Sequence, residues 1–218
     1  TVTTGNYNVA MGHNALHFAT TAGKNTAVGY LALFDNTDGH SNTAVGCNAG
    51  QNITTGDYNV AIGHDSLAAA TTAGQLTAVG RAALANNTTG SQNVACGYGT
   101  LINNTTGDSN TALGYAALTT VTTGISNTAV GRDALYYGNG SDNTAVGNEA
   151  LENNTASNNT AVGSDAMHLT TTGADNTAMG YQALLTNTTG ANMTAVGHQA
   201  LYANTTGSSN VALGKSAL

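Results

Sequence analysis

Charged residues are scarce in this sequence, with 4 Lys and Arg and 11 Asp and Glu among 218 residues. Nucleic acid is therefore not an expected partner, because neutralising phosphates requires clusters of Lys and Arg. Long hydrophobic runs are also lacking, so no segment is predicted to span a membrane. The first residues do not have the pattern of a signal peptide, which predicts a mature product or a fragment.

One short motif, in contrast, recurs along the whole chain. Residues 127–131 are N-T-A-V-G, and close copies begin at positions 8, 25, 42, 59, 76, 93, 110, 127, 143, 159, 176, 193 and 210. The spacing is 17 residues, apart from two steps of 16 residues between positions 127 and 159. Such a period is typical of stacked repeats in which each unit packs on its neighbours. We therefore predict a single repetitive domain over residues 1–218.

The pattern within each unit predicts β-structure. The first five residues alternate, are rich in β-branched side chains and end in Gly, which is typical of a short strand followed by a turn. Leu is the usual ninth residue, and a polar stretch that often ends in T-T-G completes the unit. We predict an all-β fold, a parallel β-solenoid or β-roll of about 13 coils with two short strands per coil.

Two apolar faces compete for the interior of each coil. The fourth residue is never polar, whereas the third is Ala in every unit, and alternation places them on opposite faces. Either the fourth-position row fills the coil, or the Ala face lies inside and another chain covers the fourth-position row. Both arrangements favour a homo-oligomer, most simply a trimer, because one coil buries little apolar surface. First-position Asn residues are expected to form a ladder along one edge.

The motif N-T-A-V-G-x-x-A-L resembles the S-V-A-I-G-x-x-A/S repeat in the head domains of trimeric autotransporter adhesins. It is also similar to N-T-A-V-G-x-x-A-L-x-x-N-T-T-G arrays in bacteriophage tail-fibre proteins. The similarity extends over the whole chain, through Ala129, Val130, Gly131 and their equivalents. It implies left-handed parallel β-rolls that associate as trimers. The unit here is longer than that of the adhesin heads and has a regular ninth-position Leu.

The sixth position, directly after each Gly, is the most varied. Stacked coils would align its rings and cations along one edge, where they are able to stack on sugars or contact acidic glycans. A solvated turn with larger side chains is the simpler interpretation, because residue identity changes without pattern. The candidate binding row consists of His13, Tyr30, His64, Arg81, Tyr98, Tyr115, Arg132, Tyr181 and His198.

No catalytic, cofactor or metal site is predicted. The seventh-position acidic residues Asp65, Asp133, Glu149 and Asp165 are interpreted as isolated, solvated carboxylates, since the G-G-x-G-x-D repeats of calcium-binding β-rolls are absent. The histidines His13, His64 and His198 lie at least three coils apart and are not expected to share a metal. No Ser, Cys or His has the spacing of a nucleophile and base, so an enzyme is not expected.

Asn-x-Ser/Thr sequences are frequent and have two interpretations. They are glycan acceptors in a secreted archaeal or eukaryotic protein, or their Asn and Thr residues serve turns and ladders. We favour the second interpretation. Examples begin at Asn52, Asn87, Asn104, Asn139, Asn187 and Asn204.

The two ends of the chain suggest that it continues into further protein. Residues 1–5 lie in the polar stretch of one unit, and the chain stops at Leu218, in the apolar part of another. Neither end has Pro, a helical pattern or a charged segment that would cap a stack of coils. We expect an internal stretch of a longer fibre, or a subunit that stacks on the next one along a filament axis.

These observations lead to two hypotheses about function. The first is a structural segment of an extracellular fibre or stalk, in a surface adhesin or phage tail fibre, located outside the cell, at its surface or on a virion. Its partners are copies of itself and cell-surface glycans. The alternative is a ligand- or ice-binding β-solenoid, with Thr pairs such as Thr54 and Thr55 as the binding row. Adjacent strand residues point to opposite faces, however, so only one rank of this row would face outward.

Overall fold

The computed structural model describes residues 5–218. Residues 1–4, part of the polar stretch on which the expectation of a continuing fibre rests, lie outside the described residues. The chain divides into two compact units, Thr1–Ser109 and Asn110–Leu218. All regular elements between residues 5 and 218 are strands, and that part of the chain has no helix of the length and apolarity needed to cross a membrane.

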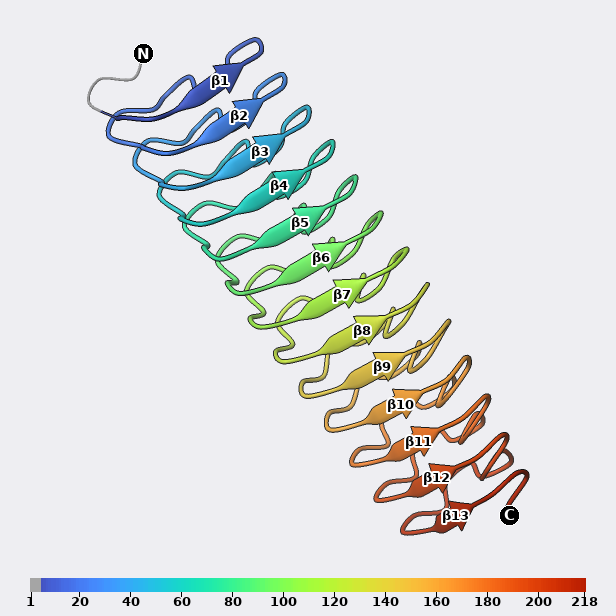
Figure 1. The fold of residues 1–218 in the computed structure, drawn as a ribbon. Coiled ribbons are helices and arrows are strands. Elements are labelled where there is room, and N and C mark those ends of the chain that lie inside the picture. The colour runs from blue at the N-terminus through green and yellow to red at the C-terminus, as the bar shows by residue number, and fades with distance from the viewer. Residues whose placement is uncertain (1–4) are drawn as a thin grey trace. The chain divides into compact units, whose positions relative to one another are not determined.

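Each strand has three residues and occupies positions two to four of a repeat. The first unit contains β1 (Val9–Met11), β2 (Thr26–Val28), β3 (Thr43–Val45), β4 (Val60–Ile62), β5 (Thr77–Val79) and β6 (Val94–Cys96). The second contains β7 (Thr111–Leu113), β8 (Thr128–Val130), β9 (Thr144–Val146), β10 (Thr160–Val162), β11 (Thr177–Met179), β12 (Thr194–Val196) and β13 (Val211–Leu213). Within each unit, successive strands lie side by side and point the same way (Figure 1).

The pairing confirms the predicted parallel β-solenoid. Equivalent residues of successive coils lie opposite each other, as in Ala27 with Ala44 and Thr128 with Thr144. The register is retained at the 16-residue coils, because the residue is missing from the polar stretch rather than from the strand.

The prediction of two strands per coil is wrong, because the described coils contain one strand each. The ninth-position residues have left-handed backbone conformations, as shown by φ values of 48° at Leu33 and 51° at Leu135. A β-strand requires negative φ, so the second apolar row forms a turn. The backbone of this turn is nevertheless hydrogen-bonded to the next coil, since the amide of Leu33 donates to the carbonyl of Ala49 at 3.0 Å.

The interior of most coils is lined by Ala at positions three and eight and by Leu at position nine. In the coil that begins at Asn127, these are Ala129, Ala134 and Leu135, each 0% exposed. The fourth-position side chains point outward, and none of them is buried in either unit. The structure therefore selects the second arrangement, with the Ala face inside and the larger apolar row outside.

Glycine is required at position five for two reasons, its backbone conformation and the close approach of the next coil. Gly131 has a φ of 139°, which L-residues rarely adopt. A Cβ at Gly131 would also lie 2.3 Å from the carbonyl oxygen of Gly147 in the next coil. The turn after each strand thus depends on Gly for its conformation and for the close stacking of successive coils.

First-position Asn side chains are buried in the coils between Asn8 and Asn210 rather than arranged along an exposed edge. The side-chain oxygen of Asn42 accepts a hydrogen bond from the backbone amide of Asn59 in the next coil, at 2.9 Å. Its side-chain nitrogen donates to the carbonyl of Gly56 in its own coil, at 2.8 Å. Each such Asn therefore satisfies two buried backbone groups and connects two coils.

Three of the Asn-x-Ser/Thr sequences named above have a structural explanation in the polar turns. Asn87, Asn104 and Asn187 are buried, and each donates from its side-chain nitrogen to the carbonyl of a Gly three residues later, at 2.8, 3.0 and 3.0 Å. These short-range hydrogen bonds from side chain to backbone close the polar turn. The turn interpretation is therefore supported at these three positions.

The coil that begins at Asn42 departs from the repeat at two core positions. Gly50 replaces the ninth-position Leu, and Ile53 occupies position twelve, where most other coils have Ala, Thr or Asn. Both residues are fully buried. A Cβ at Gly50 would lie 3.0 Å from the Cδ1 of Ile53 and 3.2 Å from a methyl carbon of Leu33. The Ile53 side chain thus fills the space that a ninth-position Leu occupies elsewhere.

This exchange predicts strong coupling between the two positions. Ile53→Ala removes a buried side chain and is expected to destabilise the protein by about 2–5 kcal/mol. Gly50→Leu places a second large side chain in the same space and is expected to cost about 1–3 kcal/mol. The double variant restores the arrangement of the other coils and should recover most of the lost stability. Chemical denaturation of the four proteins measures the coupling, and additive losses would contradict it.

The Asn ladder generates a second prediction. Asn42→Ala leaves the amide of Asn59 and the carbonyl of Gly56 without their side-chain partner, at a cost of about 1–3 kcal/mol per unsatisfied group. Thr43→Ala serves as the control and should have a much smaller effect, because Thr43 follows Asn42 in the chain and its side chain points outward. Equal melting temperatures for the two variants would show that the ladder contributes little.

Candidate binding surfaces

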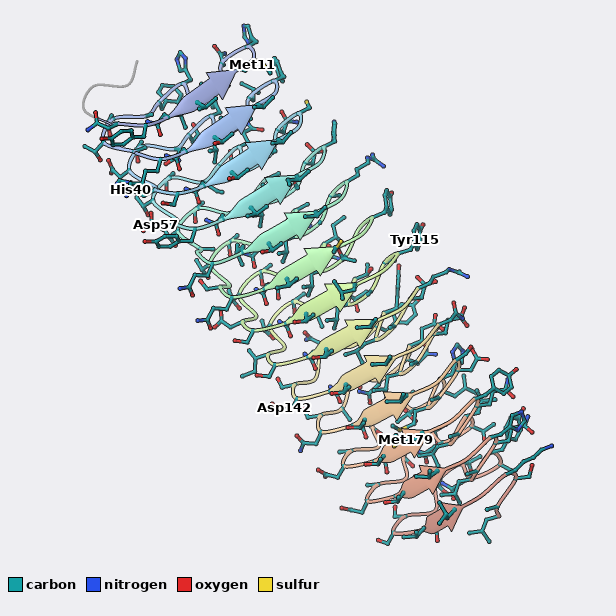
Figure 2. All side chains as sticks on the ribbon, in the orientation of Figure 1. Met11, His40, Asp57, Tyr115, Asp142 and Met179 are labelled. Atoms are coloured by element: carbon teal, nitrogen blue, oxygen red, sulfur yellow. The ribbon has the colours of Figure 1, made fainter. Side chains whose placement is uncertain are left out.

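The nine sixth-position residues proposed as a binding row are all exposed. Each follows the fifth-position Gly, so its side chain projects from the turn at the end of a strand. Figure 2 shows Tyr115 at this edge of the second unit, whereas Asp142 lies at the edge where the strands begin. The row is held in register by backbone bonds, such as that from the amide of Asp133 to the carbonyl of Tyr115 at 2.9 Å.

Neighbouring members of the row contact each other in several places. His13 stacks on Tyr30 with ring centroids 5.5 Å apart and planes at 14°. Tyr181 lies against His198 with centroids 5.3 Å apart. These contacts confirm that the rings are brought together within each unit.

Arg81 has a double contact with Tyr98. Its guanidinium carbon lies 5.5 Å from the Tyr98 ring centre, and its side chain donates to the Tyr98 hydroxyl at 3.3 Å. The row is not continuous, because Cys47 interrupts it in the first unit and Asn148 and Ser164 interrupt it in the second. It therefore presents short aromatic and cationic clusters rather than one extended strip.

A second surface, the outer sheet face, is formed by the second- and fourth-position residues of the strands. The second position is Thr or Val and the fourth is Val, Ile, Leu, Met or Cys, so the face has no charge in any coil. None of these side chains is buried, and the exposed fractions include 39% for Ile62 and 45% for Met179. Cys96, the cysteine of the fourth-position row, is likewise exposed. Contiguous apolar surface of this kind marks interaction sites.

The T-T-G stretch forms a different, more polar edge. The first Thr of each pair uses its hydroxyl within the solenoid, as Thr54 donates to the carbonyl of Thr71 at 3.1 Å and Thr188 to that of Thr205 at 3.0 Å. The second Thr is exposed, as at Thr55 and Thr189. One rank of hydroxyls thus faces outward at this edge, as the sequence predicted.

The interpretation of the seventh-position acids as isolated and solvated is wrong. Asp133 is 13% exposed at its side chain and lies 2.9 Å from the Nε of Arg132. Asp65 accepts from the Nδ2 of Asn48 at 2.9 Å. The position is partly covered because the left-handed turn directs these side chains along the stack rather than away from it.

Sequence reasoning missed a cluster in the second unit, formed by Glu149, Glu152, Asp165 and His168. The Nδ1 of His168 lies 3.1 Å from a carboxylate oxygen of Glu152 and 3.8 Å from one of Glu149. Burial raises the pKa of Glu152, and the neighbouring Glu149 carboxylate raises it further, whereas His168 opposes the increase.

A signal for this cluster was present in the sequence. Glu149 and Glu152 are the only glutamates in the chain. They occupy the seventh and tenth positions of one coil, and Asp165 and His168 occupy the same positions of the next. Stacking of equivalent positions would have been enough to bring the four together. Among residues 5–218, the grouping of potential metal ligands is Glu149, Asp165 and His168, and it includes none of His13, His64 and His198.

Comparison of the chain with protein-family models, with curated proteins and with solved structures found no match.

Proposed function

We propose that this protein is a structural segment of an extracellular fibre or stalk, in which identical chains associate through their outer sheet faces. One observation carries the proposal: the row of large apolar side chains lies outside the coil, while the interior is filled by Ala and Leu. A row of partly exposed Val, Ile, Leu and Met side chains gains hydrophobic stabilisation when another chain covers it. The absence of charge from this face removes the main cost of such contact.

The regularity of the solenoid supports a spacer role. Within each unit, successive coils are joined by backbone bonds at the strand and in the turns, and most of them also by buried Asn side chains. These contacts change little with salt, since few of them involve charges. A homotrimer is the expected assembly, because the resemblance to the heads of trimeric adhesins implies three chains.

The remaining surfaces are available for external contacts in this arrangement. The aromatic and cationic clusters of the sixth position lie at the end of the strands, beside the outer sheet face. They would offer ring faces to cell-surface glycans, as in the pair His13 and Tyr30. The fibre is accordingly proposed to act at the cell surface or on a virion.

The association is tested by sedimentation. The native protein is expected to have the mass of three chains. The double variant Met179→Lys and Val196→Lys introduces charge into the outer sheet face and should sediment as a single folded chain, because the substituted side chains project into solvent in the monomer. The matched control, Thr172→Lys and Thr189→Lys, adds the same charge to the exposed T-T-G edge and should keep the native mass. A native protein that is monomeric at micromolar concentration would refute the proposed association.

A second candidate function, ice binding, is favoured by a specific feature of the same face. Residues two apart on a strand lie about 6.6–6.8 Å apart, and equivalent residues of neighbouring strands about 4.7–4.9 Å apart. The outer sheet face therefore presents two parallel ranks, one mainly Thr and one apolar, on a regular lattice. The Thr-Thr stretch considered from the sequence offers only one outward rank.

Ice binding and chain association make opposite demands on this face. An ice-binding protein must keep the face free, so inhibition of ice recrystallisation should accompany a monomeric native state. In that case Thr144→Lys and Thr160→Lys together should abolish the inhibition, and the T-T-G control variant should retain it. A trimeric native protein without effect on ice growth would exclude this candidate.

A further inference from the structure

The second unit departs from the repeat at one chemically distinctive place. The four residues Glu149, Glu152, Asp165 and His168 are grouped in two successive coils of a chain with few charges. The solenoid does not require them, because the next coil has Gln182 and Leu185 at the same two positions and retains the same turn, with a φ of 52° at Gln182. Their presence therefore has an explanation other than folding of the turn.

The geometry of the cluster suits a single cation. Glu149, Asp165 and His168 each offer one ligand atom, and these three atoms lie within 4.8 Å of one another. Metal–ligand bonds of about 2.0–2.2 Å place the ligand atoms at most about 4.4 Å apart, so a small shift of these side chains brings all three atoms to one ion. The carboxylate of Glu152 lies beside this grouping, 3.1 Å from the Nδ1 of His168.

The imidazole of His168 supplies an independent indication. Its Nδ1 is shielded from solvent and has no hydrogen-bond partner. It faces the carboxylates of Glu149 and Glu152 at 3.8 and 3.1 Å. With its proton on Nε2, the imidazole presents an Nδ1 lone pair to this space, where a metal ion can bind it together with the carboxylates.

We propose that Glu149, Asp165 and His168 bind a divalent transition-metal ion that joins two successive coils, with Glu152 beside the site. The donor set of one imidazole nitrogen and several carboxylate oxygens suits Zn²⁺. Ca²⁺ prefers six to eight oxygen ligands and is expected to bind more weakly here. The side chains of Glu149, Glu152 and His168 are 29%, 22% and 25% exposed, so the site is partly covered yet open to an ion from solvent.

Polar side chains around the cluster contact its carboxylates. Arg132 lies 3.9 Å from the second carboxylate oxygen of Glu149 and 2.9 Å from Asp133. Gln182 donates from its side chain to Asp165 at 3.4 Å. These partners orient the carboxylates from outside the site, as second-layer residues commonly do around metals. The inference concerns this cluster alone and does not depend on the proposed fibre role.

Isothermal titration of the full chain with Zn²⁺ tests the site. The native protein is expected to bind one ion per chain more tightly than any additional ions, and thermal denaturation should shift to higher temperature when Zn²⁺ is added. Glu149→Gln and His168→Leu should each weaken this binding at least about tenfold and remove the thermal shift. Both substitutions introduce residues that the coil beginning at Asn176 has at the same positions, Gln182 and Leu185, so the variants are expected to fold.

Two control variants separate this site from adventitious binding. His198→Gln removes an exposed histidine from the sixth-position row, and Asp142→Asn removes an exposed carboxylate from the opposite edge of the same unit (Figure 2). Both should bind Zn²⁺ as the native protein does. Co²⁺ in place of Zn²⁺ provides a second readout, because its visible spectrum reports coordination by the protein and should change in the His168→Leu variant.

Three results would overturn the proposal. The first is the absence of saturable Zn²⁺ binding. The second is binding that survives Glu149→Gln and His168→Leu but is lost in His198→Gln. The third is binding of Ca²⁺ at the same site with equal or greater affinity, which would contradict the assigned donor chemistry. If one of the two site variants failed to fold, the other would decide the outcome.

Discussion

The interior of each coil is only deep enough for an alanine to face a leucine, and this narrow space constrains the rest of the structure. Ala129 and Leu135 fill it in one coil, and both are inaccessible to solvent. A larger third-position residue would separate the strand from the opposing turn, so the larger apolar residue of each strand is directed outward. Gly50 and Ile53 show the same constraint, because the coil that has the large Ile53 side chain has Gly instead of Leu at position nine.

A thin apolar interior is compatible with a folded chain because its polar groups are bonded. The buried Asn42 satisfies one amide of the next coil and one carbonyl of its own. Residues in left-handed turns, such as Leu33 with a φ of 48°, carry a conformational cost. The cost is offset by burial of the leucine and by its amide bond to the next coil. Stability is thus distributed along the stack of each unit rather than concentrated in one core.

Repetition also separates two kinds of surface. The outer sheet face repeats the same uncharged pattern in every coil. It therefore suits a partner that also has a regular repeat, such as a second chain or a crystal lattice. The cluster around His168 occurs at one place and depends on residues that differ from those of the adjoining coils. Such a singular group suits a single small ligand. A repeat protein of this type therefore combines an extended contact surface with local sites produced by substitution within the repeat.

The sequence by itself determined the period, the strand, the parallel pairing and the register, because equivalent residues such as Ala129 and Ala145 recur at fixed spacing and pair when coils stack. It also predicted the exposed sixth-position row. It did not determine which face of the strand is inside, since alternation defines two faces without assigning either to the core. Nor did it reveal the turn at Leu135, because a short apolar stretch fits a strand equally well. Only coil closure, which brings Glu149 beside His168 and turns Val130 outward, decided these features.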